Sequence, residues 1–148
     1  MPSAQPKATL VPESFVRDIE TSREFCVGML GFEVLLERPE DGFLYLAREG
    51  AELMLDTIDQ GRTWLADPAD PPYRCGVSLM IWAQDAAALC AHVKENGGHV
   101  FLELEDKWYR CNDTYSGSRQ FIVQDPDGYL LRFAKDIGER SRETPELA

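Results

Sequence analysis

The sequence predicts an α+β fold of two tandem βαβββ modules that form a curved mixed sheet around a groove. The first observation is a repeat of helix boundaries. Asp18 and Asp85 are each placed to cap a helix, and Gly31 and Gly98 each follow 13 residues later, an offset of 67 residues. The second observation is that apolar residues alternate in the segments after each helix, as is typical of strands. Together they indicate a duplicated unit.

The first module begins with a strand from Leu10 to Val16. Pro12 interrupts this strand, and because proline has no N–H to donate, the strand is an edge or a hinge. Asp18 then caps a helix that runs to about Leu30 and is stopped by Gly31. Three strands follow at 32–37, 43–48 and 51–57.

The second module repeats this order. We expect a strand at 77–83, a helix at 86–96 and strands at 100–104, 121–123 and 129–133. The last two strands are joined by Asp125-Pro126-Asp127-Gly128, a strong signal for a tight turn. The boundaries are therefore 9–57 for the first module, 58–74 for a proline-rich linker, 75–135 for the second module and 136–148 for a charged, frayed tail. Within the second module, the polar segment 105–118 is expected to form a loop that carries aromatic residues.

Composition limits the class of partner and the compartment. The chain of 148 residues has 26 acidic and 15 basic residues, a net charge of -11, which argues against nucleic acid. No apolar run is long enough to span a membrane, and no apolar leader precedes the first strand, so we expect a cytoplasmic protein. Cys26, Cys75, Cys90 and Cys111 are then reduced thiols, with disulfides as the alternative.

Strand alternation separates two faces of the predicted sheet. One face is apolar and packs under the helices; it holds Leu53, Leu55, Val77, Leu79, Ile81, Leu131 and Phe133. The other mixes charged and large apolar side chains, and it holds Glu52, Met54, Asp56, Ser78, Met80, Trp82, Leu130, Arg132 and Ala134. A mixed face suits a ligand groove, although a subunit interface or an exposed face would look similar.

Several phrases of the sequence resemble the vicinal oxygen chelate superfamily (glyoxalases, bleomycin resistance proteins and dioxygenases), and within it the bleomycin resistance branch. The phrases are Val16-Arg17-Asp18 leading to Phe25, Met29-Leu30-Gly31-Phe32, Asn96-Gly97-Gly98, and Arg119 through Asp125-Pro126-Asp127-Gly128 to Phe133. The resemblance covers about residues 9–135. It implies the paired βαβββ fold but no single activity, because several chemistries share this fold.

Enzymes of this superfamily hold a divalent metal with His, Glu or Gln from four strands. Counting from the helix caps and from the turn glycines places these positions at Val11, Met54, Ser78 and Arg132. Val offers no donor atom, the sulfur of Met suits soft ions, and Arg is a cation that repels a metal. His92 and His99 have no second histidine at ligand spacing. We therefore expect no metal and no cofactor.

Without a metal, the resemblance implies reversible binding of a small molecule. Bleomycin resistance proteins are acidic dimers that sequester cationic, flat-ringed drugs. Pro12 matches the proline at which their first strand crosses to the partner, and Phe43 matches an aromatic residue of their groove. Leu36 and Gly117 stand where that family has a groove phenylalanine and the tryptophan that stacks on the drug. The chain is thus expected to be a homodimer that sequesters a cationic or aromatic antibiotic-like ligand.

The candidate ligand-binding residues are Phe43, Met54, Asp56, Trp82, Trp108, Tyr109, Tyr115 and Arg132. Several have a structural alternative: Trp82 could pack at a dimer contact or in the core, Trp108 and Tyr109 could anchor a surface loop, and Asp56 could pair with Arg132 across the sheet. Arg132 could also hold a carboxylate or phosphate. Two other functions stay open, namely a glyoxalase-like or dioxygenase-like enzyme with a displaced metal site and an interaction module with a vestigial groove.

Overall fold

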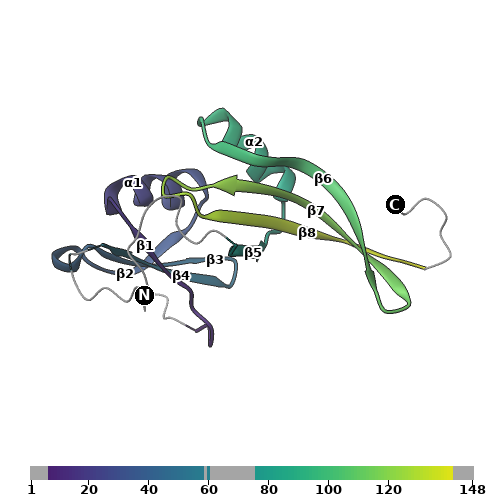
Figure 1. The fold of residues 1–148 in the computed structure, drawn as a ribbon, viewed down its shortest axis with the longest axis horizontal. Coiled ribbons are helices and arrows are strands. Elements are labelled where there is room, and N and C mark those ends of the chain that lie inside the picture. The colour runs from purple at the N-terminus through teal and green to yellow at the C-terminus, as the bar shows by residue number, and fades with distance from the viewer. Residues whose placement is uncertain (1–6, 59, 61–75, 142–148) are drawn as a thin grey trace, which may run out of the picture. The chain divides into compact units, whose positions relative to one another are not determined.

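The computed structural model describes residues 7–58, 60 and 76–141. The chain divides into two compact units: Met1–Cys75 with Asp125–Tyr129, and Gly76–Gln124 with Leu130–Ala148. Each unit carries one four-stranded mixed sheet with a helix, so the predicted α+β class with two βαβββ modules is confirmed (Figure 1). Most of the predicted linker 58–74 lies outside the described residues, as do Trp64 and Cys75.

The first unit has the strand order β1-β4-β3-β2, with β1 parallel to β4. Its elements are β1 (Glu13–Val16), α1 (Ile19–Arg23), a π-helix (Glu24–Met29), β2 (Glu33–Arg38), a 3-10 turn (Pro39–Asp41), β3 (Phe43–Arg48) and β4 (Ala51–Thr57). The first strand therefore starts three residues later than the expected Leu10. The Pro12 carbonyl still accepts a hydrogen bond from the Met54 N–H at 2.9 Å, which fixes the entry into β1.

The first helix begins and ends where the sequence predicted. The Asp18 carboxylate accepts hydrogen bonds from the Glu20 N–H at 3.2 Å and the Thr21 hydroxyl at 2.8 Å. The second half widens into a π-helix, in which the Leu30 N–H donates to the Phe25 carbonyl. Gly31 follows with φ +83°, a left-handed conformation that glycine adopts without strain.

The core of the first unit lies between this helix and one face of the sheet. The buried apolar side chains include Val16, Phe25, Cys26, Leu30, Phe32, Leu44, Leu46, Leu53 and Leu55. They include the two β4 residues assigned from the sequence to the face under the helices, so the predicted parity is confirmed for this strand. The alternate residues of β4, Glu52, Met54 and Asp56, therefore lie on the opposite, mixed face of the sheet.

The turn Asp125–Tyr129 belongs to the first unit although it joins two strands of the second. The Asp127 carboxylate, only 2% exposed, accepts hydrogen bonds from the Arg17 Nε at 2.8 Å and the Arg17 N–H at 3.1 Å. The Tyr129 hydroxyl donates to the Phe15 carbonyl at 2.9 Å. Hydrogen bonds therefore attach the turn to Phe15 on β1 and to Arg17, which directly follows β1.

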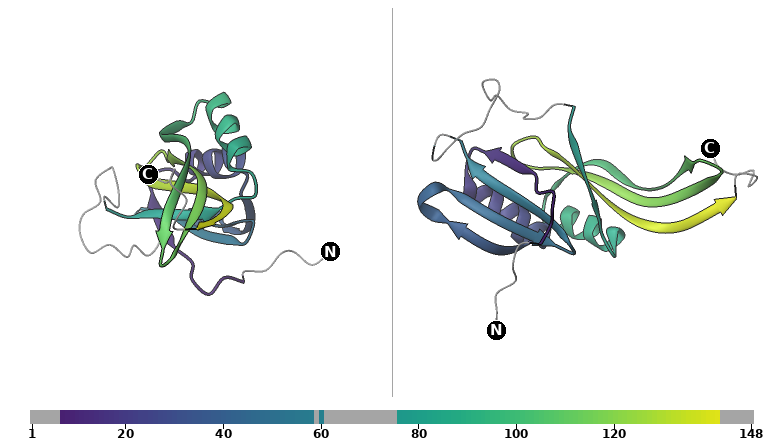
Figure 2. Two further views of the ribbon diagram at one scale, coloured as in Figure 1. Left: turned by 90° about the vertical axis from the view of Figure 1, so that its right-hand side faces the viewer. Right: turned by 90° about the horizontal axis from the view of Figure 1, so that it is seen from below.

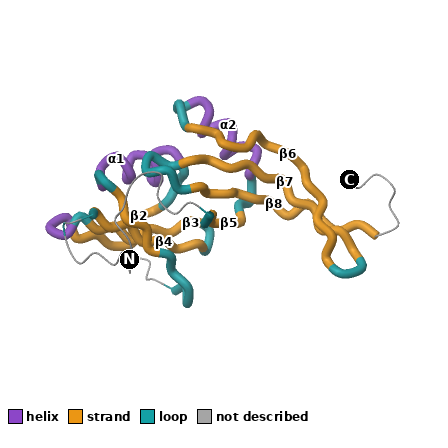
Figure 3. The backbone as a smooth tube through the Cα atoms, in the orientation of Figure 1, coloured by secondary structure: helices purple, strands orange, loops and turns teal. Residues whose placement is uncertain are grey.

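The second unit has the order β5-β8-β7-β6. Its elements are β5 (Ser78–Trp82), α2 (Ala86–Glu95), β6 (His99–Cys111), β7 (Thr114–Gln124) and β8 (Leu130–Ser141). Asp85 caps α2 as predicted, since its carboxylate accepts from the Ala88 N–H at 3.0 Å. Figures 2 and 3 show β6, β7 and β8 continuing well past α2 as a three-stranded ribbon.

This ribbon corrects two expectations. The segment 105–118 is not a loop, because it forms the paired ends of β6 and β7 around a short turn. The residues 136–141 are not frayed, because β8 continues through them beside β7. The ribbon carries polar residues on both sides, so its sequence lacks the apolar alternation that identifies a half-buried strand.

The strand register supports the duplication. Glu13 pairs with Met54 in the first unit, and Met80 pairs with Arg132 in the second. These positions are related by the offsets of 67 and 78 residues that the caps and turn glycines give. The two halves are therefore equivalent in register as well as in element order.

Candidate functional site

The mixed face of the first unit brings two carboxylates together beside large side chains. In the sheet, Met54 lies between Glu13 on β1 and Tyr45 on β3. Two residues further along β4, Asp56 lies between Phe15 on β1 and Phe43 on β3. Paired residues in neighbouring strands project to the same side, so these side chains share one face. We call it the acidic face.

The two carboxylates of the acidic face favour their protonated forms more than free carboxylates do. Burial is the main cause of the raised pKa of Glu13, and the nearby Asp56 charge adds to it. Burial also raises the pKa of Asp56, while Arg38 opposes this effect. The attraction of a cation bound next to both groups would offset the cost of burying their charges and their mutual repulsion, and would favour the ionised state of both.

Arg38 supplies the positive charge nearest to this pair. Its guanidinium lies over the ring of Phe43, 4.0 Å from the centroid, and its Nε is 3.3 Å from an oxygen of Asp41. Phe43 is 4% exposed and is therefore part of the floor rather than a free stacking surface. A flat cation at this face would compete with Arg38 for the same ring.

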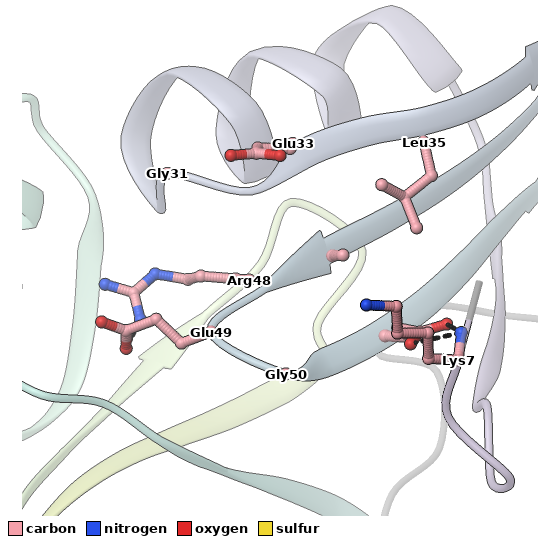
Figure 4. A pocket seen from close by; sticks show the side chains of 9 residues that line it. Lys7, Gly31, Glu33, Leu35, Arg48, Glu49 and Gly50 are labelled. Atoms are coloured by element: carbon pink, nitrogen blue, oxygen red, sulfur yellow. Dashed lines mark hydrogen bonds and ion pairs between the residues drawn. The ribbon is translucent and has the colours of Figure 1, made fainter. Parts of the chain in front are cut away.

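A cavity of about 460 Å³ lies near the turn between β3 and β4 (Figure 4). It is lined by Lys7, Gly31, Glu33, Leu35, Ala47, Arg48, Glu49, Gly50 and Glu52. The Glu52 carboxylate accepts hydrogen bonds from the Tyr45 hydroxyl at 2.7 Å and from the backbone N–H groups of Lys7 and Ala8 at 2.9 and 2.7 Å. Glu52 is thus occupied in holding the start of the described chain.

The corresponding face of the second unit is more apolar. Trp82 pairs with Ala134, and Met80 pairs with Arg132, whose other neighbour is Ile122. Trp82 is 58% exposed and Met80 is 41% exposed. The Arg132 Nη2 donates to the Met80 sulfur at 3.2 Å. We call the surface made by Met80, Trp82, Ile122, Leu130 and Arg132 the Trp82 face.

Tyr109 lies on the same side of the second sheet. It pairs with Ser116, which alternates along β7 with the buried Gln120 and with Ile122. The Gln120 amide donates to the Tyr109 hydroxyl at 2.7 Å and to the Glu105 carboxylate at 3.1 Å. The Tyr109 hydroxyl is therefore positioned by the sheet and not by a loop.

Trp108 and Tyr115 lie on the opposite side, so the structure does not group them with Trp82, Tyr109 and Arg132. Trp108 pairs with Gly117, and a Cβ at that glycine would come within 2.7 Å of the Trp108 ring. The guanidinium of Arg140 lies 4.0 Å from the centroid of the same ring. Trp108 thus packs against Gly117 and Arg140.

The donor set at the four family metal positions does not fit a hard divalent ion. Val11 has no donor atom, and the guanidinium of Arg132 approaches a thioether. Within residues 7–58, 60 and 76–141, no three His, Cys, Asp or Glu side chains gather in a way that could hold a metal ion.

Sequence reasoning missed Glu13, Tyr45 and Arg38 as members of the acidic face. Glu13 follows Val11 by two residues, so strand alternation alone places both on one side. Tyr45 and Arg38 could be found only through the pairing of β2 with β3 and β3 with β4.

Cys26, Cys90 and Cys111 are free thiols, the first two buried and the third exposed. No helix in the part of the chain that the structure describes is long and apolar enough to cross a membrane.

Comparison with family models gives one match over most of the chain. Residues 10–133 match the model described as the glyoxalase/bleomycin resistance protein/dioxygenase superfamily. A solved superfamily member of that description from Vibrio splendidus 12B01 is 36% identical, over 84% of this chain and 95% of that one, with a TM-score of 0.40. No curated protein matches the chain.

Two further solved structures resemble the fold. TioX from Micromonospora sp. ML1 is 22% identical with a TM-score of 0.70, over 88% of this chain and 100% of that one. A protein of unknown function from Agrobacterium tumefaciens str. C58 is 23% identical with a TM-score of 0.63, over 89% of this chain and 96% of that one. At these identities the likeness concerns the fold alone.

Proposed function

The chain belongs to the glyoxalase/bleomycin resistance protein/dioxygenase superfamily, and on that premise we propose that it is a metal-free binding protein. It sequesters a cationic or aromatic, antibiotic-like small molecule. The observation that carries the proposal is the acidic face of the first unit, on which Glu13 of β1 and Asp56 of β4 lie next to Met54.

The chemistry of this face favours binding over catalysis. Two half-buried carboxylates next to Phe43, Tyr45 and Met54 offer charge-assisted hydrogen bonds and soft apolar contact to a protonated amine on a flat ring. The family metal positions hold residues that do not fit a hard divalent ion. The chain's net charge of -11 also raises the encounter rate with cations.

A thermal-shift screen over cationic glycopeptides and small cationic aromatic compounds tests the proposal, with equilibrium dialysis of the hits. The double variant Glu13→Gln/Asp56→Asn should weaken binding of a hit about tenfold or more, because each charged hydrogen bond contributes about 1.5–3 kcal/mol. The matched control is Glu24→Gln/Glu40→Gln, which removes the same charge from exposed positions. Equal losses in both variants would show that net charge and not the acidic face is responsible.

Reversibility separates binding from turnover. After dialysis against excess competitor, the compound should be recovered unchanged in mass. Conversion of the compound by the chain with no added metal would contradict the proposal.

We further propose that the chain acts in the cytoplasm as a homodimer in which the first strand is exchanged near Pro12. In support, Pro12 lies directly before β1 and has no N–H to donate to a neighbouring strand. Sedimentation of a single species near the chain mass of 16.7 kDa at high micromolar concentration would contradict the dimer.

A further inference from the structure

The second unit carries an arginine whose surroundings are unusual for this acidic chain. Arg132 is half-buried on β8, and its neighbours across the strands on the Trp82 face are Met80 and Ile122. Along β8, the residues on the same face are Leu130 and Ala134. The guanidinium therefore emerges among side chains that carry no charge.

No ion pair of the described residues involves Arg132. Among the described residues, its side chain makes a polar contact with the thioether sulfur of Met80, a weak acceptor. By contrast, Arg119 on β7 forms two hydrogen bonds with the carboxylate of Asp106, at 2.8 and 3.0 Å. In a chain with 26 acidic residues, a half-buried guanidinium whose partner among the described residues is a thioether is a candidate for binding an external anion.

A flat aromatic surface lies next to this charge. Trp82 follows Met80 by two residues on β5 and projects to the same side, diagonal to Arg132. Its cross-strand neighbour is Ala134, whose methyl group is too small to cover an indole ring, and Trp82 stays 58% exposed. An indole left uncovered beside a guanidinium is suited to stack on a ring whose anionic substituent reaches the arginine.

We propose that the Trp82 face is a binding site for a planar aromatic oxyanion. Arg132 holds the oxyanion through its two-pronged N–H geometry, Trp82 stacks on the ring, and Met80 and Ile122 flank the ion pair and reduce its exposure to water. This site is on the second unit and binds an anion, whereas the acidic face of the first unit binds a cation. The inference therefore goes beyond the proposed function and can fail independently of it.

The probe is 2-naphthoate, titrated into the full chain and followed by the indole N–H signals in two-dimensional NMR. The neutral isostere 2-naphthamide has the same ring, and 2-naphthylmethylamine carries the opposite charge. We expect saturable binding of 2-naphthoate with a shift of the Trp82 indole signal, assigned through Trp82→Leu. The acid should bind about tenfold or more tightly than the amide, and the difference should shrink with salt.

Variants separate charge from stacking. Arg132→Gln should weaken 2-naphthoate about tenfold or more and leave the amide nearly unchanged, since only the charged contact is lost. The affinity of Arg132→Lys for 2-naphthoate should fall between those of the unsubstituted chain and Arg132→Gln, because lysine keeps the charge but lacks the two-pronged guanidinium. Trp82→Leu should weaken both probes by a similar factor. The control Arg110→Gln removes an exposed guanidinium elsewhere in the same unit and should change neither.

Three results would overturn the inference. One is the absence of a Trp82 shift with 2-naphthoate at millimolar concentrations. Another is tighter binding of 2-naphthylmethylamine than of 2-naphthoate at Trp82. The third is an Arg132→Gln affinity within about twofold of the unchanged chain. The acid-to-amide ratio of the unsubstituted chain decides the matter even if a variant fails to fold. Parallel titration with 1-naphthyl phosphate shows whether the site prefers a carboxylate or a phosphate.

Discussion

Replacing Asp125 by Asn removes a buried carboxylate and should make the chain more stable near neutral pH. Burial is the main cause that raises the pKa of Asp125 from 3.8 to about 6, and the backbone N–H groups of Tyr129 and Asp127 oppose it. Those N–H groups lie 2.8 and 2.9 Å from one carboxylate oxygen. Asparagine keeps that oxygen and loses the charge.

The sign follows from proton binding. The folded chain binds the Asp125 proton more tightly than the unfolded chain does, so this group stabilises the fold below pH 4. That contribution is lost as pH rises through the folded value of about 6. The shift of about 2 units corresponds to about 3 kcal/mol in the free energy of unfolding, at about 1.4 kcal/mol per unit.

The assay is urea unfolding of the unsubstituted chain and Asp125→Asn at several pH values from 4 to 7. The two should be similar near pH 4, and the variant should be more stable by up to about 3 kcal/mol at pH 7. Asp18→Asn is the control for removing one carboxylate that also accepts backbone N–H bonds. A difference that does not change with pH, or a variant that is less stable at pH 7, would refute the assignment of a costly buried charge.

Two other predictions concern packing and ion pairing. Arg17→Ala should lower the free energy of unfolding by about 1.5–3 kcal/mol, because it leaves the buried Asp127 carboxylate without its charged donor; an unchanged urea midpoint would contradict this. Gly117→Ala should cost about 1–3 kcal/mol and shift the tryptophan fluorescence, because its methyl group would lie 2.7 Å from the Trp108 ring. The control Gly28→Ala meets no atom within 4 Å and should stabilise the helix by about 0.5–1 kcal/mol; equal effects of the two glycine changes would rule out the steric explanation.

The elements that the sequence predicted well are those with local signals. The caps Asp18 and Asp85 and the glycine after the first helix are read from single residues with a defined conformational role. The strands β3 and β4 match their predicted bounds. In β4 one buried face gives a clear alternation, whereas β3 is a short apolar run whose first four residues are all buried. The shortened first strand shows that the proline sets where regular pairing with β4 can begin.

The parts that the sequence did not predict depend on tertiary pairing. The bulges near Val100 and Leu102 in β6 change which side later residues face, so Trp108 and Tyr109 could not be assigned from parity counted along the chain. The turn Asp125–Tyr129 was recognised as a turn, but its packing in the first unit depends on Arg17, far away in sequence. Likewise, only the β1–β4 register shows that Glu13 and Asp56 lie close together on one face.

Calorimetric titration of a cationic screening hit into metal-depleted chain tests the central claim most directly. We expect saturable binding after exhaustive treatment with EDTA, the same affinity after Ni²⁺, Zn²⁺, Mn²⁺ or Fe²⁺ is added back, and a loss of affinity of about tenfold or more in Glu13→Gln/Asp56→Asn. Binding that appears only with added metal, or that is unchanged in this variant, would contradict a metal-free site on the acidic face.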